Sequence, residues 1–87
     1  MKYSILLSGR AEKQLNKIAK KEQKLIARGI SDLIKFSETT SGNIKKLKTP
    51  FPGYRKRVGN YRILFEVDKG AKRIIIYKIG HRKDIYK

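Results

Sequence analysis

The sequence predicts an α+β domain in the order β-α-α-β-β-β, with a helical hairpin packed on one face of a mostly antiparallel four-stranded sheet. Three observations predict it. Helical periodicity is confined to residues 8–37, β-rich apolar segments lie on both sides of that region, and a Gly59-Asn60 turn separates two of those segments. A chain of 87 residues has room for one core, so residues 1–87 are expected to form a single domain.

The first strand and the first helix are adjacent in the sequence. Tyr3–Leu7 is apolar and rich in residues that favour strands. Ser8 can accept a hydrogen bond from the first turn of a helix, and Glu12 suits the positive end of that helix. The next apolar residues recur at helical spacing: Ala11, Leu15, Ile18 and Ala19.

A second helix is expected from about Glu22 to Ser37. Its apolar stripe consists of Leu25, Ile26, Gly29, Ile30, Leu33 and Ile34. Glycine inside a helix costs about 1 kcal/mol relative to alanine, which is tolerable if the two helices cross closely at Gly29. The two helices are therefore expected to form a short antiparallel hairpin.

Three strands are expected in the C-terminal half, at Tyr54–Val58, Tyr61–Asp68 and Lys72–Ile79. A polar loop, a short apolar-basic stretch at Ile44–Leu47 and a turn cluster at Pro50–Gly53 precede them. The Gly59-Asn60 turn sets the first register, in which Val58 opposes Tyr61, Arg57 opposes Arg62, Lys56 opposes Ile63 and Arg55 opposes Leu64. If the next hairpin closes at Lys69-Gly70, Glu66 opposes Arg73 and Arg62 opposes Tyr77.

Alternation of side chains gives this predicted sheet two different faces. One face is nearly all apolar and should lie under the helices, with Lys56 at its edge reaching water: Tyr54, Lys56, Val58, Tyr61, Ile63, Phe65 and Val67. The other face carries Arg55, Arg57, Arg62, Leu64 and Glu66. Because like charges directly opposite each other destabilise a sheet, the arginines indicate an anion site, with Tyr77 placed for a base to stack on. The open alternative is a solvated face that Glu66 neutralises.

The charge balance indicates a polyanionic partner. The chain has 23 Lys and Arg against 7 Asp and Glu, a net charge of +16. Seven basic residues and no acidic residue lie between Lys45 and Arg62. Such a chain should bind RNA, DNA or an acidic protein, unless the charge belongs only to a generally basic, solvated surface.

Composition excludes several kinds of site. The absence of cysteine excludes a disulfide framework, a thiolate metal site and a cysteine nucleophile, and a single histidine cannot form a histidine metal cluster. No metal and no cofactor are therefore expected. The apolar runs are too short for a membrane span and no signal peptide is evident, so we expect a cytoplasmic protein.

Three segments resemble RelE-type toxins of the RelE/ParE superfamily in order and spacing, over the whole chain. They are the helix opening at Ser8, the stretch Tyr54–Ile63 and the ending Ile79–Lys87. The resemblance implies a toxin of a type II toxin–antitoxin system that binds the ribosome, cuts mRNA without a metal and is neutralised by an acidic, RelB-like antitoxin. Two alternatives stay open: a ParE-like toxin that inhibits DNA gyrase without cutting RNA, and an inactive nucleic-acid-binding protein.

The resemblance also implies roles for single residues. Those implied in catalysis are Arg55, Arg57, Arg62, Arg82 and Tyr86, with Tyr86 stacking on the substrate base. His81 is a further catalytic candidate, proposed from its own chemistry. Those expected to contact RNA are Lys45, Lys46, Lys48, Lys56, Tyr77 and Lys83. The family often has lysine as general base where this chain has Arg57. Because arginine stays protonated, either His81 accepts the proton or catalysis relies mainly on electrostatic stabilisation.

Overall fold

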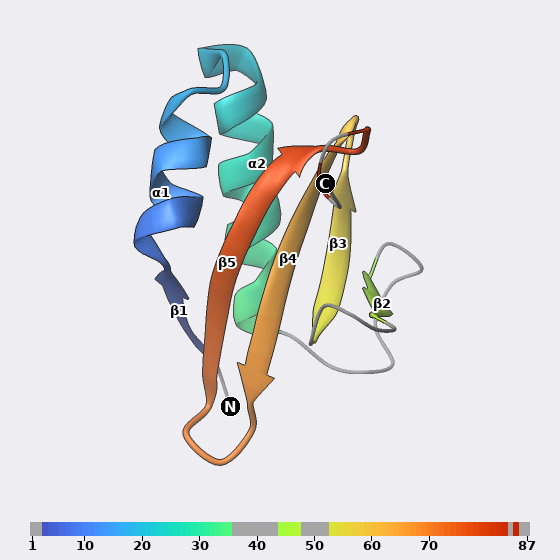
Figure 1. The fold of residues 1–87 in the computed structure, drawn as a ribbon. Coiled ribbons are helices and arrows are strands. Elements are labelled where there is room, and N and C mark those ends of the chain that lie inside the picture. Colours follow the sequence, from blue (N-terminus) through green and yellow to red (C-terminus); the bar gives the residue numbers. More distant parts are fainter. Residues whose placement is uncertain (1–2, 36–43, 48–52, 84, 86–87) are drawn as a thin grey trace.

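The computed structural model describes residues 3–35, 44–47, 53–83 and 85. Two helices cover one face of a five-stranded sheet (Figure 1), which confirms the predicted α+β class and adds one strand to it. In chain order the elements are β1 (Ser4–Leu7), α1 (Gly9–Asn16), α2 (Lys20–Asp32), the 3-10 helix η1 (Leu33–Lys35), β2 (Ile44–Lys46), β3 (Tyr54–Val58), β4 (Tyr61–Asp68) and β5 (Arg73–His81). None of the described helices is long and apolar enough to cross a membrane.

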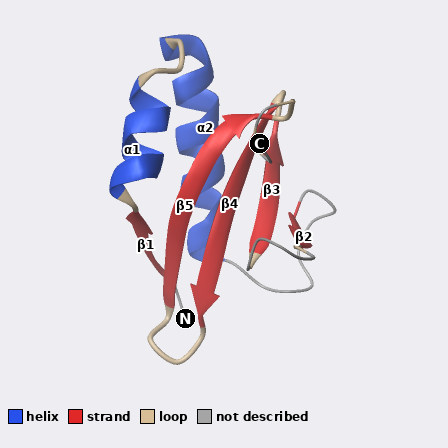
Figure 2. Cartoon of the chain, in the orientation of Figure 1, coloured by secondary structure: helices blue, strands red, loops and turns tan. Residues whose placement is uncertain are grey.

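The strands are arranged in the order β1-β5-β4-β3-β2. β1 runs parallel to β5, and every other neighbouring pair is antiparallel (Figure 2). The additional strand is β2, which was expected only as an apolar-basic stretch. Three residues are too few to show the period of two that marks a strand, and β2 is held by its pairing with β3.

The first helix begins as predicted. The Ser8 hydroxyl accepts a hydrogen bond from the Ala11 N–H at 3.1 Å, and Ala11 is fully buried. The placement of Ala19 on the same helix is wrong, because α1 ends at Asn16 and Ala19 is the exposed N-cap of α2. Leu25, expected on the apolar stripe of the second helix, is 49% exposed.

Gly29 marks a close approach between α2 and the sheet. A Cβ atom on Gly29 would lie 2.7 Å from Cγ2 of Val58 in β3. The expectation that the two helices cross at this glycine is therefore wrong. The glycine instead lets α2 pack directly against β3.

The register of the β3–β4 hairpin is confirmed, including Arg57 opposite Arg62 and Arg55 opposite Leu64. The predicted register of the next hairpin is wrong: Arg62 opposes Gly80, and Glu66 opposes Ile75. Its connection closes between Asp68 and Arg73, with Lys72 in the left-handed region, so it is longer than the Lys69-Gly70 turn. An irregularity at Leu64/Phe65 then leaves Tyr77 with no residue opposite it on β4.

The core lies between the helices and the sheet, which confirms the assignment of the two sheet faces. Its buried side chains are Ala11, Ile26, Leu33, Ile63, Phe65, Ile74, Ile76 and Ile79. Tyr54, Val58, Tyr61 and Val67 pack against this cluster, as the alternation of the strands predicts. The arginines therefore lie on the other face of the sheet.

Candidate functional site

Four basic side chains from three neighbouring strands lie close together on the face of the sheet away from the helices. These are Lys45 of β2, Arg55 and Arg57 of β3, and Arg62 of β4, and we call this surface the arginine face. Lys45 pairs with Arg55, so the additional strand widens the basic surface by one residue. Neighbouring strands lie about 4.8 Å apart and residues two apart on one strand about 6.8 Å. The four side chains therefore start within a patch that one or two phosphate groups can span.

Arg57 and Arg62 lie directly across from each other within this patch. Arg57 is exposed, whereas Arg62 is half-buried and its Nη1 atom is inaccessible to solvent. A like-charge pair in this position opposes sheet formation. A bound anion would relieve that repulsion, and two guanidinium forks suit the oxygens of a phosphate.

Lys78 is the residue near this site that the sequence analysis missed. Lys78 belongs to β5 and lies opposite Leu64 of β4. Leu64 in turn pairs with Arg55 and Arg55 with Lys45, so the four residues form one row across the sheet. Only 7% of Lys78 is exposed. Burial, and secondarily the nearby charge of Arg10, lower the pKa of the Lys78 amine. The wrong β4–β5 register concealed this position, since only the correct register puts Lys78 in that row.

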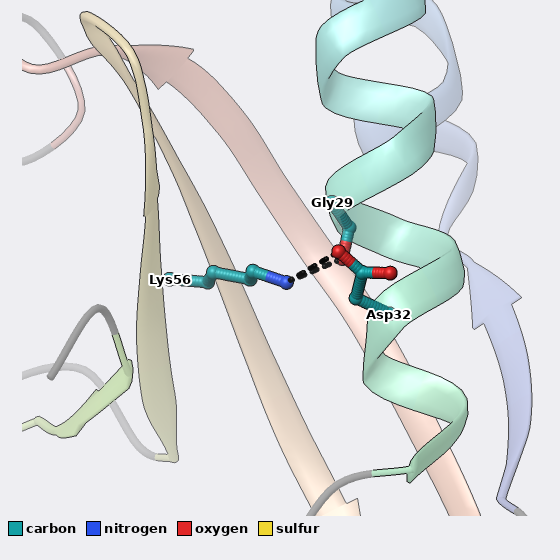
Figure 3. A network of polar contacts seen from close by, with 3 residues as sticks. All are labelled: Gly29, Asp32 and Lys56. Atoms are coloured by element: carbon teal, nitrogen blue, oxygen red, sulfur yellow. Dashed lines mark hydrogen bonds and ion pairs between the residues drawn. The ribbon is translucent and has the colours of Figure 1, made fainter. Parts of the chain in front are cut away.

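Lys56 lies on the helix side and not on the arginine face. Its Nζ atom donates a hydrogen bond of 2.8 Å to the Gly29 carbonyl and lies 3.9 Å from an Asp32 carboxylate oxygen (Figure 3). Burial lowers the pKa of Lys56, while the charge of Asp32 raises it. The expectation that this ammonium reaches water at the sheet edge is wrong, because it turns to the end of α2, where carbonyl groups attract a cation.

His81 is likewise separated from the arginines. It pairs with Tyr61, and the two rings meet edge to face with centroids 5.6 Å apart. Tyr61 packs against the helix-side core, and both residues line a pocket of about 240 Å³ between α2 and the tip of the β3–β4 hairpin. The Nδ1 atom of His81 accepts a hydrogen bond from the Lys83 N–H at 3.2 Å. This placement puts the imidazole on the opposite face of the sheet from Arg57 and Arg62.

The remaining predicted site residues are scattered. The Arg82 N–H donates to the Asn60 carbonyl at 2.9 Å, so Arg82 lies beside the hairpin tip with its side chain exposed. Lys46 and Lys83 are exposed, and Lys46 pairs with Tyr54, a residue of the helix side. The expectation that Tyr77 opposes Arg62 is wrong. Tyr86 and Lys48 lie outside the described residues.

The described residues contain no group of three or more His, Cys, Asp or Glu side chains that could hold a metal ion. What the arginine face offers a ligand is a set of positive charges. Fixed cations stabilise negative charge that develops on a reacting phosphate. None of the three arginines can accept a proton.

Comparison with known proteins identifies the family. Residues 5–86 match the family model of the ParE toxin of the type II toxin–antitoxin system parDE. A search of curated proteins gave no match. Among solved structures, the chain is similar to a protein of the RelB–RelE antitoxin–toxin complex from Methanococcus jannaschii, with 34% identity, a TM-score of 0.73, and coverage of 93% of this chain and 94% of that chain.

Two further complexes show the same fold at lower identity. The match to the RelBE2 toxin–antitoxin complex from Mycobacterium tuberculosis has 21% identity and a TM-score of 0.82, and covers 94% of this chain and 100% of that one. The match to the archaeal RelE–RelB complex from Pyrococcus horikoshii has 23% identity and a TM-score of 0.80, and covers 97% of this chain and 99% of that one. The chain therefore belongs to the family of ParE toxins of type II toxin–antitoxin systems, within the RelE/ParE superfamily.

Proposed function

We propose that this toxin is a metal-independent endoribonuclease that cuts mRNA on the ribosome. The observation that carries the proposal is the arginine face, above all the direct pairing of Arg57 with Arg62. This pair lies outside the helix-side core, and like charges directly opposite each other oppose sheet formation. A role in binding a reacting phosphate explains why the chain keeps it.

The proposed reaction is an attack of the RNA's own 2′-oxygen on the adjacent phosphate. The O2′–P bond forms and the P–O5′ bond breaks, which leaves a 2′,3′-cyclic phosphate and a free 5′-hydroxyl. The proton of the 2′-hydroxyl leaves to water, and the departing 5′-oxygen takes up a proton. Arg55, Arg57 and Arg62 hold the phosphate and stabilise the charge that grows on it.

The placement of His81 supports the electrostatic version of this mechanism. Its ring contacts Tyr61 on the helix side, so it is poorly placed to take a proton from a nucleotide on the arginine face. Arg82 lies beside the hairpin tip, from where its exposed side chain can reach the leaving-group side. We assign Tyr86 to stacking on the substrate base on the strength of the family resemblance.

We also propose an acidic antitoxin as the partner that neutralises the toxin. The similar structures from three organisms are toxin–antitoxin complexes, and their antitoxins carry the name RelB or form part of RelBE. A net charge of +16 favours fast association with a negatively charged chain. Binding should weaken as salt is added, because exposed charges are screened.

A second candidate function is inhibition of DNA gyrase without RNA cleavage. The match to the ParE family model favours it. In that case the basic surface would bind a protein or DNA and no phosphate bond would break. The two functions predict different products, so one set of assays separates them.

The test is a reconstituted translation reaction with purified toxin and a defined mRNA. We expect new 5′-hydroxyl ends and 2′,3′-cyclic phosphates within the coding sequence only when ribosomes are present, and naked mRNA is the control. An intact message, together with inhibition of DNA supercoiling by purified gyrase, would replace this proposal with the second one.

A further inference from the structure

The chain reverses direction after β5 and returns onto the arginine face. The Ile85 N–H donates to the His81 carbonyl at 2.9 Å, and the Arg82 N–H donates to Asn60 at 2.9 Å. Figure 1 shows the end of β5 and the coloured residues 82–83 that follow it beside the tip of the β3–β4 hairpin. We call the described residues of this reversal, 81–83 and 85, the C-terminal turn.

Ile85 ends this turn in a buried position outside the main core. Only 1% of it is exposed, yet it is absent from the helix-side cluster, as is the fully buried Leu64. Leu64 lies on the arginine face, between Arg55 and Lys78 in the register. Two buried apolar side chains, Leu64 and Ile85, therefore lie outside the helix-side core.

Ile85 packs directly against Gly80. A Cβ atom on Gly80 would lie 3.1 Å from Cδ1 and 3.9 Å from Cα of Ile85. Gly80 does not adopt a positive φ, so the backbone conformation does not require glycine there. What the position requires is space for Ile85. Because Gly80 pairs with Arg62, this contact lies next to the arginine face.

We propose that Gly80 and Ile85 are positioning residues for the reaction. Their contact fixes the C-terminal turn against the arginine face, which holds Arg82 beside the hairpin tip and limits the space open to the Arg62 side chain. The expected effect on cleavage rests on the proposed function. The contact between Gly80 and Ile85 does not, because it exists in the free protein.

The contact suggests a matched pair of substitutions. Gly80→Ala places a methyl group 3.1 Å from Cδ1 of Ile85, closer than an ordinary contact, so Ile85 must move by a few tenths of an ångström. Ile85→Val removes that same Cδ1 atom, so the double variant Gly80→Ala/Ile85→Val should accommodate the methyl group. Gly9→Ala is the control, since a Cβ atom at Gly9 has no neighbour within 4 Å.

The first measurement is amide hydrogen exchange on the free toxin. We expect Gly80→Ala to speed exchange of the Arg82 and Ile85 amides about 10-fold or more, because local opening of the turn exposes them. Amides of β4 should keep their wild-type rates. The double variant should restore most of the protection, and Gly9→Ala should match the wild type.

The second measurement is the rate of mRNA cleavage on ribosomes. A displacement of about 1 Å at a catalytic group can cost about 100-fold in rate. Because Ile85 must move by a few tenths of an ångström, we expect Gly80→Ala to lose about 2- to 10-fold in rate, and the double variant to recover most of that loss. Normal exchange in Gly80→Ala, or faster exchange with a wild-type cleavage rate, would overturn the inference. A wild-type toxin that cuts no mRNA would instead refute the proposed function, while the exchange data still decide whether the contact fixes the turn.

Discussion

Replacing Arg57 by glutamine should raise stability and lower activity at the same time. Arg57 is exposed and lies directly across from Arg62. Arg57→Gln removes one charge of this pair and keeps a long polar side chain. Arg57 is a cleaner position for this test than Arg62, whose half-buried side chain also contributes packing.

The two effects differ in size as well as in sign. Like charges directly opposite in an antiparallel sheet destabilise by roughly 0.2–1 kcal/mol. We therefore expect the free energy of unfolding to rise by a few tenths of a kcal/mol within that range. Loss of one fixed charge contact to a transition state costs about 10²–10³ in rate. Because Arg57 is exposed, we expect a loss in cleavage near the lower end, about 10²-fold.

The assay combines urea unfolding with ribosome-dependent cleavage of a defined mRNA. Arg73→Gln is the matched control, since it removes the same charge on the same face but pairs with Asp68, about 20 Å along the strand direction. At 0.15 M salt the Debye length is about 8 Å, so the control should cut mRNA at close to the wild-type rate. Arg57→Lys keeps the charge and should retain most activity.

If Arg57→Gln cuts mRNA at the wild-type rate, the arginine pair does not hold the reacting phosphate. If instead its free energy of unfolding falls by more than 1 kcal/mol, the repulsion between Arg57 and Arg62 is not the dominant interaction at this position.

Three further predictions concern the scaffold. Phe65→Ala should lower the free energy of unfolding by about 3–5 kcal/mol, because it leaves a cavity in the core. Glu66→Ala, at the exposed neighbouring position, should change it by less than about 0.5 kcal/mol. Equal changes in urea unfolding would contradict our assignment of the two sheet faces. Gly29→Ala should destabilise despite a helix-propensity gain of about 1 kcal/mol, because its Cβ meets Val58 at 2.7 Å, and a more stable variant would show that α2 can move away from β3. Burial lowers the pKa of Lys56 and Lys78 in the native state, so just below the ordinary value of 10.5 the unfolded chain binds more protons than the native one. The free energy of unfolding measured in urea should therefore rise as pH rises towards that value. If Lys56→Met leaves the slope of this free energy against pH unchanged, the burial of Lys56 does not cause the rise.

The sequence predicted the features that local rules determine. The Ser8 cap follows from its hydroxyl and the helical spacing after it, and the β3–β4 register follows from a two-residue turn. The two faces of β4 then follow from alternation alone. These rules were sufficient to place Arg55, Arg57 and Arg62 on one surface.

Features that depend on contacts distant in sequence were not predictable in the same way. The β4–β5 register depends on a longer connection and on an irregularity at Leu64/Phe65, which no turn signal reports. That shift moved Tyr77 away from Arg62 and brought Gly80 to it. The strand β2 and the contact between Gly80 and Ile85 likewise exist only through tertiary packing.

Lys56 and His81 show how far residue type can mislead about a site. A basic residue between two arginines, and the chain's only histidine, both favour a role in the chemistry. Strand alternation turns Lys56 to the Gly29 carbonyl and His81 to Tyr61, both on the helix side. The face of the sheet to which strand alternation assigns a residue was therefore a better guide to the site than the chemical type of its side chain.

The most direct test of the central claim compares wild-type toxin with Arg62→Ala in cells, with 5′ ends of mRNA mapped across the transcriptome. Binding of both proteins to the antitoxin serves as the check that the variant is folded. The account predicts that wild-type toxin arrests translation and creates new 5′ ends within translated sequences, and that Arg62→Ala creates none. Growth arrest by the wild type without new mRNA ends, accompanied by trapped gyrase–DNA complexes, would contradict it.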